Sequence, residues 1–166
     1  MMPLSVGRVV VGVDGSPGSL HALRRAVEFS RAWQAPLFPV LAWQPPGGEA
    51  PARLRQIPEL ERDWCRGAED RLNAAFEEGL GAIPLDLDCE PQIVRGPAGP
   101  ALVQVADRPD DLIVVGSGRH GALARLTHSH IAAYCVAHAS CCVIAVPPPP
   151  LAGIPRHLRH ARRLAA

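Results

Sequence analysis

Lysine is absent from this chain of 166 residues, because all 17 of its basic residues are arginines. A P-loop nucleotide site places a lysine on the phosphates, and Schiff-base enzymes use a lysine amine as their nucleophile. Both kinds of site are therefore excluded. The 16 acidic residues nearly balance the arginines and leave a formal net charge of +1. So small a charge creates no global field, and we expect neither a specific nucleic acid nor a membrane as a partner.

Acidic residues are missing from the last third of the chain, where none follows Asp111 although arginines continue to Arg163. The chain also has no apolar run near the roughly 18 residues of a membrane-spanning helix. Its five cysteines are odd in number, and its first residues lack the pattern of a signal peptide. We therefore expect reduced thiols and a soluble, cytoplasmic protein.

Apolar residues make up 48% of the chain, enough for one buried core. Short apolar runs predict strands at residues 9–13, 37–43, 85–94, 112–115 and 142–146, although Pro39 is awkward in a paired strand. Helical spacing predicts helices at 19–33, 60–79, 101–106 and 131–138, the first capped by Ser16 or Ser19. This alternation predicts a single open, doubly wound parallel α/β sheet with helices on both faces.

We expect one domain over residues 1–147, followed by a proline spacer and a basic C-terminal tail over residues 148–166. As a helix, the tail would place Ile154, Leu158, Ala161 and Ala165 on one face with arginines around them. A solvated and mostly disordered tail is favoured over this helix, because so short a helix is marginal without packing.

Two segments follow strands at the edge where open parallel sheets collect ligands, residues 14–16 and 116–121. Glycines there let backbone N–H groups approach a phosphate, and otherwise serve as flexible turns. Residues 116–121 also match the dinucleotide fingerprint. That fingerprint belongs on the first strand–helix turn, with an acid about 20 residues later. Since no acid follows Asp111, NAD binding is not expected.

Four segments of the chain resemble the universal stress proteins in order and spacing: VVVGVDGS at 9–16, VRGPA at 94–98, VVGSG at 114–118 and CVIAV at 142–146. The likeness extends over residues 7–147 and implies a five-stranded sheet of order 3-2-1-4-5, a homodimer and, in many members, an ATP site. It implies that Asp14 meets the adenine or ribose and that Ala42 offers its backbone to adenine. Helix capping is the alternative role for Asp14. The candidate nucleotide-binding residues are Val13, Asp14, Gly15, Ser16, Ala42, Gly116, Gly118, Arg119 and Ser129.

The phosphate loop departs from the family pattern, in which G-x-x-G is followed after nine residues by G-S or G-T. Here the first part is one residue shorter, His128 replaces the glycine before Ser129, and Ile131 stands where a hydroxyl is common. We therefore expect weak or absent ATP binding, with another adenine nucleotide possible. Alternatively, His120, His128 and Arg119 rebuild an anion site that favours a monophosphate, or the protein is a ligand-free structural or partner-binding dimer.

Enzymatic and metal chemistry have little support in the sequence. Ser117 lacks a nucleophile elbow, and no nearby acid can orient His120 or His128. A metal site is not expected either, because Cys135 and His138, at helical i, i+3 spacing, are more typical of a core. The cluster considered for zinc or copper comprises His120, His128, His130, Cys135, His138, Cys141 and Cys142. We expect a non-enzymatic stress-response regulator that acts through a homodimer at residues 142–146 or an unknown protein partner.

Overall fold

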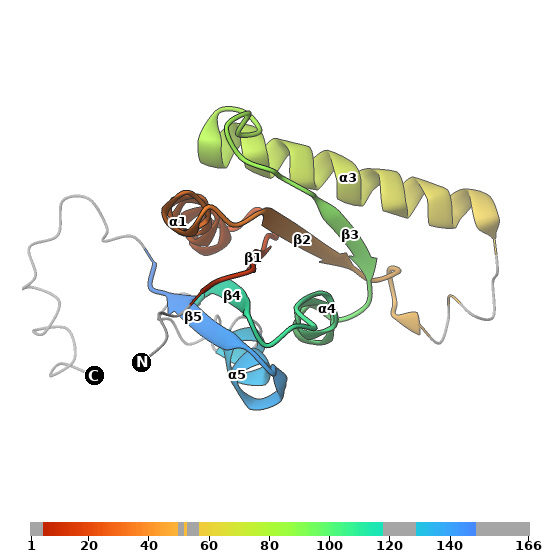
Figure 1. Cartoon of the computed structure of the whole chain (residues 1–166). Helices are drawn as coiled ribbons and strands as arrows, with labels where there is room; N and C mark the ends of the chain where they lie inside the picture. The colour runs from red at the N-terminus through yellow and green to blue at the C-terminus, as the bar shows by residue number, and fades with distance from the viewer. Residues whose placement is uncertain (1–4, 50–51, 53–56, 118–128, 149–166) are drawn as a thin grey trace, which may run out of the picture.

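The computed structural model describes residues 5–49, 52, 57–117 and 129–148. Five parallel strands form one sheet in the order β3-β2-β1-β4-β5 (Figure 1). This confirms both the fold class and the strand order expected from the sequence. The strands are β1 (Arg8–Gly12), β2 (Leu37–Trp43), β3 (Gln92–Arg95), β4 (Asp111–Gly116) and β5 (Cys142–Val146).

Helices cover both faces of the sheet. α1 (Pro17–Trp33) and α3 (Pro58–Leu80) lie on one face, and α4 (Ala98–Val105) and α5 (Ser129–His138) lie on the other (Figure 1). The valines of β1 alternate between the two cores: Val9 and Val11 belong to the cluster beneath α1 and α3, and Val10 to the cluster beneath α4 and α5. Burial on both faces explains why β1 is a continuous apolar run.

The outer strand expected at residues 85–94 is wrong for residues 85–91. β3 begins only at Gln92, and before it Cys89 forms an isolated bridge with Leu37. Leu85 is 99% exposed. The alternating apolar and acidic residues here form a turn and not a strand. Arg31 holds Asp86 near α1, and Pro91 interrupts the chain before β3. The expected position of this strand at an edge of the sheet is confirmed.

Pro39 lies inside β2 without disrupting its pairing to β1. Backbone groups alternate between the two neighbours of a parallel strand. Val40 accepts from the Val13 N–H on the β1 side, whereas Leu37 bonds to Asp88 and Glu90 on the other side. Pro39 therefore faces the β3 side as well. On that side the pairing of β2 with β3 starts one residue after Pro39, where Val40 lies opposite Gln92. The missing N–H falls in this gap between the isolated bridge and β3.

Within the part of the chain that the structure describes, no helix is long and apolar enough to cross a membrane. Residues 149–166 lie outside the described residues, so the division into a domain and a basic tail stays a prediction.

Candidate functional site

The strand order reverses between β1 and β4, where two neighbouring parallel strands lead to connections that run in opposite directions. β1 and β4 pair with Val11 opposite Val114, so both end at the same edge of the sheet. Such a switch point is where open α/β sheets bind ligands. The structure thus brings together the turn at Asp14–Ser16 and the end of β4 at Gly116, as the sequence predicts.

The turn at Asp14 is fixed by hydrogen bonds within a few residues. The Ser16 N–H donates to Asp14 Oδ1 at 2.8 Å, and Gly15 between them has φ +79°. Ser16 caps α1, because its Oγ accepts from the Ser19 N–H at 3.2 Å. Of the two predicted caps, Ser16 is therefore confirmed. Asp14 instead supports the turn that leads into the helix, with its exposed carboxylate at the sheet edge.

Gly116 has a packing role in addition to any role at a phosphate. A Cβ at this position would lie 3.0 Å from the carbonyl carbon and oxygen of Gly18, in the first turn of α1. Only glycine lets the end of β4 approach the helix backbone this closely. The following Ser117 N–H donates to Val146 O at 2.8 Å and ties this edge to β5.

The end of β2 forms the neighbouring part of the same edge. Ala42 is half-buried, and Trp43 is 7% exposed within the core cluster that also contains Val13. Arg95, at the end of β3, lies over the Trp43 ring with 5.5 Å between its guanidinium carbon and the ring centroid. Glu49 raises the pKa of Arg95 by hydrogen bonding. Sequence reasoning missed Arg95, although it lies within the VRGPA motif.

The other candidate residues are only partly described. Gly118 and Arg119, with His120 and His128, lie outside the described residues. Ser129 is the first residue of α5, and its side chain is not described. Ile131 packs against the core beneath α4 and α5.

Cys135 and His138 have different surroundings, and the expectation that both are core residues is wrong for His138. Cys135 is fully buried, and this burial raises its pKa to about 11. His138 is exposed and stacks on Tyr134 with ring centroids 4.0 Å apart. Residues three apart differ by about 60° around a helix. Cys135 lies on the buried face of α5, and His138 lies just outside that face. Among the described residues, no group of three His, Cys, Asp or Glu side chains is placed to hold a metal.

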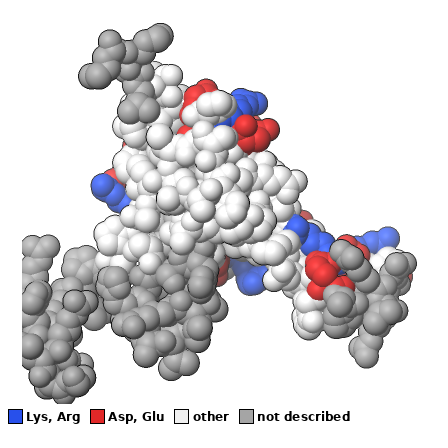
Figure 2. All heavy atoms as spheres, turned by 90° about the horizontal axis from the view of Figure 1, so that it is seen from below, with Lys and Arg blue, Asp and Glu red and all other residues white. Residues whose placement is uncertain are grey.

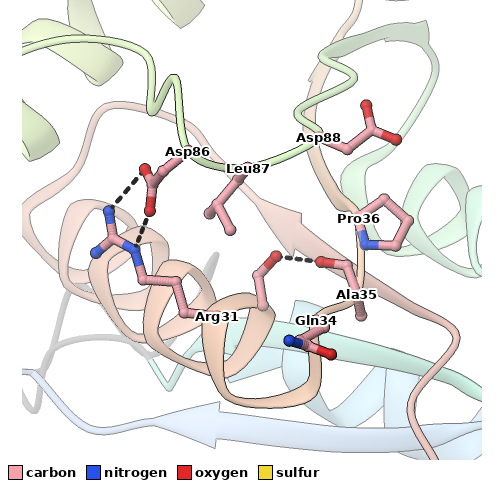
Figure 3. A pocket seen from close by; sticks show the side chains of 8 residues that line it. Arg31, Gln34, Ala35, Pro36, Asp86, Leu87 and Asp88 are labelled. Carbon is pink, nitrogen blue, oxygen red and sulfur yellow. Dashed lines mark hydrogen bonds and ion pairs between the residues drawn. The ribbon is translucent and has the colours of Figure 1, made fainter.

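A separate groove of about 460 Å³ lies at the opposite, amino edge of the sheet (Figure 3). Arg31 and Asp86 pair at its rim, through hydrogen bonds of 2.7 and 3.0 Å. The start of β2 puts the groove at the other end of the sheet from Asp14 and Gly116. Its lining consists of Ser30, Arg31, Gln34, Ala35, Pro36, Asp86, Leu87 and Asp88.

The sequence model of the universal stress protein family matches residues 5–147. The chain belongs to this family. A universal stress protein of Synechocystis sp. is 28% identical over 90 residues, which cover 54% of this chain and 83% of that protein. A solved structure of a universal stress protein in complex with cAMP is 33% identical, with a TM-score of 0.54, and covers 86% of this chain and 97% of that one.

The universal stress protein UspA from Lactobacillus plantarum shares the fold of this universal stress protein. It is 22% identical with a TM-score of 0.66, and the match covers 87% of this chain and 99% of that one. The family expected from the four sequence segments is therefore confirmed.

Proposed function

We propose that this universal stress protein is a non-enzymatic regulator that binds an adenine nucleotide at the edge formed by Asp14–Ser16 and Gly116, and that it prefers a monophosphate to ATP. The observation that carries the proposal is the meeting of these two segments at the switch point of the sheet. The relative solved with cAMP supports the same class of ligand.

The nucleoside side of this edge has groups suited to its ligand. Ser16 orients the exposed Asp14 carboxylate, which is an acceptor for ribose hydroxyls or an adenine amine. At the same edge Val13 follows β1 and Ala42 lies next to the last residue of β2; the Val13 side chain is buried, so Val13 would offer only its backbone. Backbone groups and a small side chain there give a flat base room to approach.

On the phosphate side of this edge, we expect a loss of affinity for ATP. Relative to the family pattern, the loop after Gly116 is one residue shorter, and His128 and Ile131 replace a glycine and a hydroxyl residue. Each unsatisfied polar group in a bound triphosphate costs about 1 to 3 kcal/mol. Two or three such defects reduce ATP affinity by orders of magnitude, whereas a single phosphate requires fewer donors. The non-enzymatic role rests on Ser117, which lacks a nucleophile elbow.

Thermal unfolding with AMP, cAMP, ATP or no ligand tests this function. A ligand at 100 times its dissociation constant stabilises the fold by about 2.7 kcal/mol. We expect AMP and cAMP to raise the melting temperature more than ATP at equal concentration, and Asp14→Asn to reduce the shift. Asp88→Asn, in the groove at the opposite edge, is the matched control. The absence of a shift with every nucleotide contradicts the proposal.

A second candidate function, partner binding by a homodimer, is favoured by the outer edge of β5, which pairs with no other strand among the described residues. Cys142 and Ala145 are exposed on this strand. No acidic or basic residue occurs between residues 126 and 155 other than histidine. Figure 2 shows a broad uncharged surface in the middle of the face that carries α4 and α5. We propose antiparallel pairing of two copies through β5, since an apolar unpaired edge is a liability that pairing removes.

A further inference from the structure

Arg95 joins three segments at the carboxyl edge of the sheet. Its Nε and Nη2 donate to the two carboxylate oxygens of Glu49, each at 3.1 Å, and its Nη1 donates to Glu61 of α3. Its guanidinium also lies over the Trp43 ring at the end of β2. Arginine suits this position because one planar group can bind a carboxylate bidentately and stack on an aromatic ring.

The turn that Arg95 holds follows β2 directly. Pro45 is buried, and the Gly48 N–H donates to Pro45 O at 2.9 Å. Gly47 and Gly48 have φ values of +83° and +88°, in the left-handed region. Two consecutive glycines make this backbone adaptable, so the chain alone does not select one conformation. The hydrogen bond to Pro45 O and the contacts of Arg95 with Glu49 together hold the turn in the observed conformation.

Trp43 connects this turn to the candidate nucleotide site. Trp43 is buried in the same core cluster as Val13. The Val13 N–H in turn donates to the carbonyl oxygen of Val40, a residue of β2, at 2.9 Å. The Gly96 N–H donates to Trp43 O at 2.8 Å on the other side. Trp43 thus links the guanidinium of Arg95 to the end of β2, one residue from Ala42.

We infer that Arg95 is a positioning residue for the nucleotide site: by holding Glu49, Glu61 and Trp43, it fixes the end of β2 against which the nucleoside lies. The inference rests on the proposed function. Exposed ion pairs add little to the free energy of unfolding. If loss of the contacts leaves the turn correctly placed for about a fifth of the time, the apparent dissociation constant rises about fivefold.

The test compares Arg95→Gln and Glu49→Gln with Arg31→Gln, which removes a bidentate pair of the same kind at the opposite edge. Two measurements are made on each full chain: the dissociation constant for AMP by calorimetry, and hydrogen exchange of the Gly47 and Gly48 amides. We expect faster exchange and about fivefold weaker AMP binding for the first two variants. The double variant should bind AMP no more weakly than Arg95→Gln alone, because Arg95→Gln already removes the contact with Glu49. Arg95→Lys should be intermediate, because lysine keeps the charge without the fork.

Three results overturn the inference, and they are distinguishable from one another. If the unmodified chain binds AMP and Arg95→Gln leaves affinity or exchange unchanged, Arg95 has no positioning role. If the unmodified chain binds no AMP, the proposed function fails and the inference fails with it. A lower melting temperature for Arg95→Gln with an unaltered dissociation constant indicates a purely structural role and also overturns it.

Discussion

The Asp111 carboxylate is fully buried at the start of β4 and is bound by Arg8 at the start of β1. Arg8 donates to its two oxygens at 2.7 and 2.6 Å, and the Arg108 N–H donates at 2.9 Å. Arg8 also lies over the Phe38 ring and reaches Asp107. A buried charge is tolerated while its partner is present. This pair therefore fixes the amino ends of the two central strands.

Replacement of Asp111 by alanine should lower the free energy of unfolding by about 3 to 5 kcal/mol, because it leaves the largely buried Arg8 without its main partner. Urea denaturation measures the loss. Asp86→Ala is the control, since Asp86 and Arg31 are both exposed, and its urea midpoint should stay close to that of the unmodified protein. Equal losses in the two variants would show that burial of the pair is unimportant.

The cysteines should differ in their reaction with iodoacetamide. Burial raises the pKa of Cys89 and Cys135 to about 11, whereas Cys142 is exposed. Because the thiolate is the nucleophile and about one Cys135 thiol in a thousand is ionised at pH 8, Cys135 should react much more slowly than Cys142. Its labelling rate should rise about tenfold per pH unit up to pH 10. Peptide mass mapping checks this order, and equal labelling of Cys135 and Cys142 at pH 8 contradicts it.

The same shift has a consequence for stability. The folded pKa of these thiols lies above the unfolded value of about 8.5, so the native state retains the proton longer. The two buried thiols therefore contribute their full stabilisation below about pH 8.5, the unfolded pKa. This contribution is lost as the pH rises from there toward the folded pKa of about 11.

At the level of single elements, β2 and β5 follow from the sequence because each is an apolar run, and β5 ends just before Pro147. The start of β3 does not follow from the sequence. The alternation of apolar and acidic residues before it fits a strand as well as the turn that Arg31 fixes. The meeting of Asp14 with Gly116 follows from the rule on switch points. The contact of Gly116 with Gly18 does not, because it depends on a distance between segments about 100 residues apart.

Gly116→Ala should separate the end of β4 from the first turn of α1. A Cβ would lie 3.0 Å from backbone atoms of Gly18, which cannot rotate away as a side chain can. We expect the free energy of unfolding to fall by about 1 to 3 kcal/mol, as for other overpacked sites. Gly67→Ala is the control of opposite sign: Gly67 lies within α3 with open space around it, and alanine there should add about 1 kcal/mol. Urea denaturation of both variants decides, and a stabilised Gly116→Ala contradicts the account.

At the scale of the whole molecule, β5 determines how two copies could meet. Val146 O accepts from Ser117, and by alternation the N–H of Ala145 points away from β4. Ala145→Pro therefore removes an outward donor and leaves the pairing with β4 intact. We expect the unmodified chain to be a dimer at micromolar concentration and Ala145→Pro to be a monomer by light scattering, with Ala145→Val as the dimeric control. A dimeric Ala145→Pro variant would place the interface elsewhere.

The switch point of β1 and β4 is proposed to bind AMP in preference to ATP. Isothermal titration of the full chain with AMP and with ATP, in the same buffer, tests it most directly. We expect AMP to bind more tightly and ATP to bind only in the millimolar range, about −4 kcal/mol. An ATP dissociation constant below roughly 10 μM, about −7 kcal/mol, would contradict it, because the shortened loop after Gly116 would then still hold a triphosphate.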